Sequence, residues 1–116
     1  MTPADSDIWL CIGAAIRTAR LARGLAQADL AREAGISRMS VTKLENGAQA
    51  VGVDLLYRMA EAVGVEASSL FPASIAAARE HATAERGRRA EAIVQRNAAD
   101  EERIRRRAAR AARLVS

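Results

Sequence analysis

Four glycines divide the first 72 residues of this chain into short segments, and this punctuation restricts what the chain can fold into. Gly24, Gly35, Gly47 and Gly64 each follow a stretch in which apolar residues recur at helical spacing. A glycine just past the end of a helix commonly adopts the left-handed conformation that closes the last turn. We find no alternating run that would indicate a β-strand. The pattern therefore predicts an all-α chain that begins with several short helices.

Five helices are expected in this part of the chain, after a flexible N-terminal arm over residues 1–7. They cover residues 8–23, 27–34, 38–45, 53–63 and 67–70. Ser37 is placed to cap the third helix, because its hydroxyl can accept a hydrogen bond from a free backbone N–H. Only three residues of the chain are aromatic, so the core must be aliphatic. Residues 8–72 are thus expected to form one small domain.

The remaining residues, 73–116, differ in kind. From Ser74 onward there is no proline and one glycine, Gly87, and the composition is dominated by Ala, Arg and Glu, which favours a helix. Opposite charges recur four residues apart, which stabilises a helix by a few tenths of a kcal/mol per pair. Apolar side chains recur eleven residues apart, at Phe71, Ala82, Ile93, Ile104 and Val115. We expect a long, weakly amphipathic C-terminal helix that binds a second copy of the chain or another protein.

Two observations limit that expectation. A heptad written through Ala90 and Asn97 places Asp100 and Arg107 at its other core positions, so an ordinary leucine zipper is not expected. The apolar stripe is also thin, and the alternative is a frayed or disordered basic tail.

Positive charge is concentrated in this tail. Residues 1–72 carry 7 basic and 8 acidic side chains, whereas residues 73–116 carry 11 arginines and 6 acids. A basic segment is attracted to polyanions, and nucleic acid is the usual partner. Charge alone supports equally well a solvated helix whose arginines form ion pairs with its own acidic residues.

Other classes of function are disfavoured by what the sequence contains. Cys11 and His81 are the single cysteine and histidine, so we expect no disulfide, metal site, cofactor or catalytic triad, and no enzyme. The apolar run at residues 8–16 is too short to span a bilayer and is typical of a buried helix. We therefore expect a soluble, cytoplasmic protein.

The stretch GISRMSVTKLENG, residues 35–47, combines a glycine turn with a short helix that leaves Arg38, Met39, Thr42 and Lys43 facing away from the core. A helix presented after such a turn fits the major groove of DNA, where each base pair shows a distinct pattern of donors and acceptors. Met39 offers an apolar surface for a thymine methyl group. The stretch therefore indicates a helix-turn-helix that reads double-stranded DNA.

IGAAIRTARLARGLAQADLAREAGISRMSVTKLENG, followed by LLYRMAEAVGVEASSLF, resembles the Cro/C1-type (XRE) helix-turn-helix family of phage and bacterial transcription regulators. The resemblance covers about residues 12–71. It implies a five-helix bundle followed, in this chain, by a long basic C-terminal helix that is not part of the family pattern. It also implies sequence-specific DNA binding as a homodimer, usually by a repressor, at an inverted repeat with half-sites about one turn apart.

The resemblance also implies roles for individual residues. Ser37, Arg38, Met39 and Lys43 are expected to contact bases, and Gln27, Ser40 and Asn46 are expected to contact the DNA backbone. Thr42 is also expected to contact bases, because it lies on the exposed polar face of the same helix. Arg20 and Glu45 are expected to form a buried structural ion pair. Many family members have glutamine where this chain has Met39, so a hydrogen bond to adenine is not available there.

The sequence leaves two alternatives open. The chain could be an antitoxin whose C-terminal helix, within residues 73–116, binds a toxin. It could instead bind RNA through the arginine-rich tail.

Overall fold

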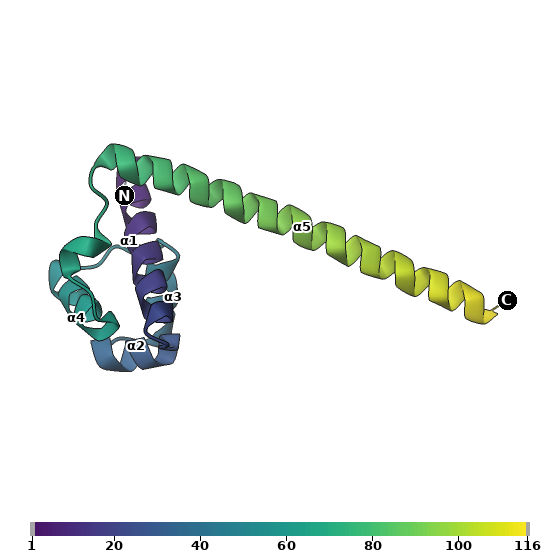
Figure 1. The fold of residues 1–116 in the computed structure, drawn as a ribbon, viewed down its shortest axis with the longest axis horizontal. Helices are drawn as coiled ribbons and strands as arrows, with labels where there is room; N and C mark the ends of the chain where they lie inside the picture. The colour runs from purple at the N-terminus through teal and green to yellow at the C-terminus, as the bar shows by residue number, and fades with distance from the viewer. Residues whose placement is uncertain (1, 116) are drawn as a thin grey trace. The chain divides into compact units, whose positions relative to one another are not determined.

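The computed structural model describes residues 2–115, and within that range every regular element is a helix (Figure 1). The helices, in chain order, are α1 (Pro3–Ala22), α2 (Gln27–Ala34), α3 (Arg38–Glu45), α4 (Val53–Val63), the 3-10 helix η1 (Ala67–Leu70) and α5 (Ile75–Val115). The predicted fold class, an all-α bundle followed by a long C-terminal helix, is confirmed. Glycines in the left-handed conformation close α2 and α4, Gly35 at φ 72° and Gly64 at φ 76°.

The prediction of an N-terminal arm is wrong, because α1 already begins at Pro3. Thr2 caps this helix: its hydroxyl accepts a hydrogen bond from the backbone N–H of Asp5, and the Asp5 carboxylate accepts one from the N–H of Thr2. These bonds hold the pKa of the Asp5 carboxyl below its usual value. Met1 lies outside the described residues. Near the other end of α1, Leu21 is 56% exposed.

The chain divides into two compact units, residues 1–82 and residues 83–116. The first unit therefore extends ten residues beyond the end at residue 72 that the sequence suggested. The reason is that Ala78 and Ala82, in the first turns of α5, are fully buried. Ser74 caps α5, since its hydroxyl oxygen accepts a hydrogen bond from the N–H of Ala77 at 3.0 Å.

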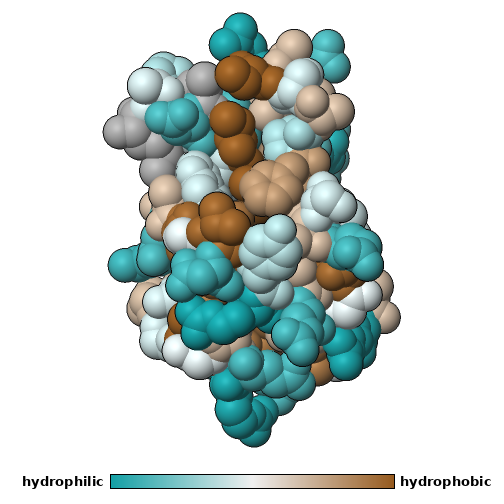
Figure 2. Space-filling view, turned by 90° about the vertical axis from the view of Figure 1, so that its left-hand side faces the viewer, coloured by the Kyte–Doolittle hydropathy of each residue, from teal (hydrophilic) through white to brown (hydrophobic). Residues whose placement is uncertain are grey.

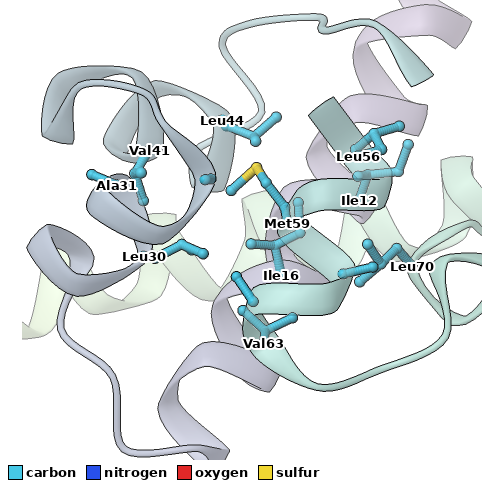
Figure 3. Packing of buried hydrophobic residues seen from close by; sticks show 13 residues of the cluster. Ile12, Ile16, Leu30, Ala31, Val41, Leu44, Leu56, Met59, Val63 and Leu70 are labelled. Atoms are coloured by element: carbon cyan, nitrogen blue, oxygen red, sulfur yellow. The ribbon is translucent and has the colours of Figure 1, made fainter. Parts of the chain in front are cut away.

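The core of the first unit is aliphatic and draws on all of its short helices. In Figure 3 the side chain of Met59 lies among residues of other helices, including Ile16 of α1 and Leu44 of α3. α1 contacts α3, α4 and η1, and α2 contacts α3 and α4. Each fully buried Leu, Ile or Met contributes roughly 1.5–3 kcal/mol relative to an exposed position. This packing fixes α2 and α3 relative to each other.

Part of the surface of this unit is also apolar. Figure 2 shows hydrophobic side chains running down one face between hydrophilic ones. The exposed large side chains of the unit include Val53 and Tyr57 of α4, Phe71 and Ile75. Phe71, the first residue of the eleven-residue spacing, is 45% exposed. Over the described residues, no helix is both long and apolar enough to cross a membrane.

Candidate nucleic-acid interface

α2 and α3 form two short helices joined by a tight turn at Gly35. The turn needs a residue at positive φ, and Gly35 supplies it without a steric penalty. Ile36 then packs against the core and Ser37 caps α3. The Ser37 hydroxyl oxygen lies 3.1 Å from the backbone nitrogen of Ser40, which donates to it. The start of α3 is thus fixed both by the turn and by the cap.

α3 has a buried side and an exposed side. Val41, Leu44 and Glu45 are buried, whereas Arg38, Met39 and Lys43 are exposed. The Met39 side chain is 64% exposed, which is high for a large apolar residue. The five positions predicted to contact bases therefore lie on α3 or beside it. Among them, Arg38, Met39 and Lys43 have exposed side chains. The base edges in the major groove present both hydrogen-bonding groups and the thymine methyl group. An exposed helix that carries charged and apolar side chains next to each other can contact both kinds of group.

The other side of α3 is anchored by a buried ion pair. The Arg20 guanidinium donates to Glu45 through Nε (2.7 Å to Oε2) and Nη2 (3.0 Å to Oε1), in a two-pronged arrangement. Only 8% of the Arg20 side chain and 2% of the Glu45 side chain are exposed. Arg20 also donates to the carbonyl oxygen of Leu25 at 2.8 Å. Helix α1, the α1–α2 turn and the end of α3 are therefore joined through a single guanidinium.

Gln27 continues this network to the exposed side. Its Nε2 donates to Glu45 Oε1 at 3.3 Å, and its Oε1 accepts from the Thr42 hydroxyl at 3.0 Å. The Thr42 hydroxyl also lies 3.1 Å from the Arg38 carbonyl oxygen. Gln27 and Thr42, predicted as a backbone contact and a base contact, are therefore brought together within the protein. Their internal role is to hold the first turn of α2 against α3.

Ser40 and Asn46, both predicted to contact the DNA backbone, lie near opposite ends of α3. The Ser40 hydroxyl is 3.0 Å from that of Ser37. Asn46 is exposed, and its N–H donates to the Thr42 carbonyl oxygen at 3.1 Å, just before Gly47 at φ 71°. The two side chains are separated by the length of the helix.

Gly13, in the middle of α1, is a structural residue that the sequence pattern did not single out. A Cβ atom at this position would collide with the carbonyl oxygens of Leu44 and Glu45. Glycine is needed here so that α1 can approach the end of α3 closely. The available signal was a lone glycine inside a helical pattern, which costs about 1 kcal/mol relative to alanine and so calls for a packing reason.

Comparison with known proteins agrees with this geometry. A helix-turn-helix family model matches residues 16–70, which end before α5. Among solved structures, the restriction-modification controller protein C.AhdI from Aeromonas hydrophila is 32% identical, with a TM-score of 0.52 over 54% of this chain and 96% of that one. The clp gene regulator ClgR from Corynebacterium glutamicum is 28% identical, with a TM-score of 0.51 over 53% of this chain and 79% of that one.

A third structure, the hypothetical transcription factor NHTF from Neisseria, is 29% identical, with a TM-score of 0.53 over 57% of this chain and 74% of that one. Among curated proteins, no sequence matches this chain. The two short helices, the turn at Gly35 and the exposed α3 define a helix-turn-helix domain. The chain belongs to the Cro/C1-type helix-turn-helix family, through residues 16–70.

Proposed function

We propose that the protein is a DNA-binding transcription regulator, and that it acts in the cytoplasm as a repressor. It binds an inverted repeat as a homodimer, with half-sites one turn of DNA, or a multiple of one turn, apart. The observation that carries this proposal is the exposed side of α3, where Arg38, Met39 and Lys43 project from a helix held by the core. No catalytic step is part of the proposal.

In the proposed complex, some residues on and beside α3 contact bases and others contact the sugar-phosphate backbone. Arg38 and Lys43 donate hydrogen bonds to guanine O6 and N7 or to nearby acceptors, and Met39 packs on a thymine methyl group. Ser37, Ser40 and Asn46 contact the edge of the groove and the sugar-phosphate chain. The Gln27 backbone N–H, at the first turn of α2, faces a phosphate, while its side chain stays bonded to Glu45 and Thr42.

The test is selection of random duplex DNA by the full chain, by Arg38→Ala and by a control variant, Arg17→Ala. Arg17 is an exposed arginine of α1, outside the helix-turn-helix, so the control removes the same charge. We expect an inverted repeat, and we expect Arg38→Ala to weaken its binding by about 1–3 kcal/mol and to relax one base position. Arg17→Ala should select the same sequence.

The proposal fails if no sequence is enriched, or if both arginine variants lose the same affinity for every sequence. Binding of that kind would depend on charge and not on base contacts. Repression, as opposed to activation, is tested separately by placing the selected site across a promoter and measuring transcription with and without the protein.

A further inference from the structure

Beyond residue 83, α5 has two opposite faces. Successive residues of a helix are rotated by about 100°, which places one set of side chains within an arc of about 100°. We call this set the seam: Val94, Asn97, Glu101, Ile104, Ala108 and Ala111. Its members are spaced alternately three and four residues apart, as in a coiled coil. The opposite arc carries seven arginines, and Arg107 lies beside the seam: the seven are Arg88, Arg89, Arg96, Arg103, Arg106, Arg110 and Arg113.

The seam is exposed and its two halves differ in size. Val94 is 66% exposed and Ile104 is 67% exposed, which is unusual for β-branched side chains at core positions of a heptad. The first half of the seam carries the larger Val94 and Asn97, whereas the second half carries Ala108 and Ala111. A partner that fits this face must therefore be small where the seam is large and large where it is small.

We propose that α5 pairs with α5 of a second copy in an antiparallel coiled coil centred between Glu102 and Arg103. In this register Val94 lies opposite Ala111 of the second copy, and Asn97 lies opposite its Ala108. Glu101 lies opposite Ile104 of the second copy. Two-fold symmetry repeats each layer, so Val94 and Asn97 of each copy meet an alanine of the other copy.

The charges beside the seam fit the same register. Asp100 and Arg107 occupy flanking positions that face each other across an antiparallel pair, and symmetry forms this contact twice. The Asp100 carboxylate already accepts a hydrogen bond from Arg103 of its own helix at 2.7 Å, but a carboxylate can accept several hydrogen bonds. Arg107 has no ion-pair partner within residues 2–115. On the same flank, Ile93 faces Leu114 of the second copy, and both are exposed in the single chain.

A parallel pair in register would be less favourable. It would place Glu101 against Glu101 in the seam, where like charges repel with little solvent screening. It would also stack alanine on alanine in the second half and leave gaps there. The antiparallel pairing avoids stacking alanine on alanine, and it places the two Glu101 side chains in neighbouring layers instead of in one layer, where each keeps Arg105 of its own helix as a partner at 3.7 Å. This inference rests on the proposed homodimer and specifies how its C-terminal helices meet.

The orientation is tested by disulfide trapping of the full chain. Cys11 is first changed to alanine; burial already raises the pKa of its thiol, but its removal leaves one defined thiol per chain. Two variants, Asn97→Cys and Ala108→Cys, are then mixed in equal amounts in a glutathione buffer. We expect the mixed disulfide to exceed either homodisulfide by about tenfold or more. In the antiparallel pair the two copies of residue 97 stand about 16 Å apart along the axis, too far for a bond.

Ala99→Cys is the matched control, because Ala99 is exposed and lies on the opposite arc. Mixed with Ala108→Cys it should give no preferred disulfide. Predominant homodisulfides would overturn the proposal in favour of a parallel pair. A dimer without disulfides would mean that other surfaces hold the copies together, and a monomer or a complex with a different protein would also overturn it. In those cases sequence selection that depends on Arg38 would still support the proposed function.

Discussion

At the scale of single residues, the buried Arg20–Glu45 pair is the feature on which the position of α3 depends. We expect Glu45→Ala to destabilise the fold by about 3–5 kcal/mol, because the Arg20 guanidinium would be left buried without its charge partner. The double variant Arg20→Met with Glu45→Leu should recover most of this loss, since it removes both charges. Denaturant unfolding of the three proteins measures the difference. Equal destabilisation by the single and the double variant would show that packing, and not the stranded charge, is responsible.

Specificity at one base pair should depend on Met39. This side chain is exposed on α3 and cannot donate or accept a strong hydrogen bond. Met39→Gln introduces an amide that can bond adenine at N6 and N7, so the preferred base at one position of each half-site should change toward adenine. Comparing the sequences selected by the two proteins tests this. An unchanged preference would place Met39 outside the groove.

The sequence indicated which residues belong to α3 and that Ser37 caps it, but it did not indicate that the Thr42 hydroxyl is occupied by an internal hydrogen bond. The position of Ser37 follows from its role as the cap, and the exposed positions of Arg38, Met39 and Lys43 follow from the helical period. Thr42 occupies an apparently equivalent position on the period, yet its hydroxyl donates within the protein, near Gln27 Oε1 and the Arg38 carbonyl. Such a bond depends on where α2 packs, which is a tertiary property that no local pattern encodes.

At the scale of secondary-structure elements, α1 and α3 pack closely because Gly13 has no side chain. Gly13→Ala should destabilise the protein by about 1–3 kcal/mol, since the new Cβ would collide with backbone atoms that cannot rotate away. Gly87→Ala in α5 is the matched control, because a Cβ there meets nothing within 4 Å. That change should instead favour the helix by about 1 kcal/mol. Thermal unfolding followed by circular dichroism measures both effects.

Helix boundaries show where sequence reasoning succeeds. α2, α3, α4 and η1 have the predicted limits, because each ends within two residues of a glycine or a proline. The start of α1 was predicted at residue 8, where the apolar run begins, and this limit gave no weight to Asp5. In the structure it completes a capping box with Thr2, and Pro3 occupies the first turn, where its missing N–H has no cost.

The stability of α5 should depend on pH through Glu85. Hydrogen bonds from Arg88 and Arg89 hold the pKa of this carboxyl below its usual value. A group with a lowered folded pKa stabilises the helix above its unfolded pKa, about 4.3, and that contribution is lost as the pH falls through the folded value. Helical circular dichroism should therefore fall as the pH drops below about 4.3, and Glu85→Gln should show a smaller change.

At the scale of the whole molecule, the two ends of the chain differ in charge. Residues 1–72 carry one more acidic than basic side chain, while the tail carries eleven arginines and six acids. Replacing Arg106 and Arg110 by glutamine should therefore reduce the salt dependence of DNA binding, by about 0.9 in the log–log slope for each phosphate that the tail no longer neutralises. The selected sequence should stay the same. Filter binding at several salt concentrations provides the measurement, and an unchanged slope would show that these arginines do not bind phosphate.

The length of α5 has a consequence for the operators that the protein can distinguish. In the proposed antiparallel pair, residue 83 of each copy is about 19.5 residues from the two-fold axis, so the two attachment points stand about 58 Å apart at about 1.5 Å per residue. One turn of DNA is about 34–36 Å, which is shorter than the distance between these attachment points. Inserting eleven residues between Thr83 and Ala90 should move the attachment points about 33 Å further apart, which is close to one turn of DNA, and the preferred spacing should increase with it. Two operators with identical half-sites would then be distinguished by their spacer alone.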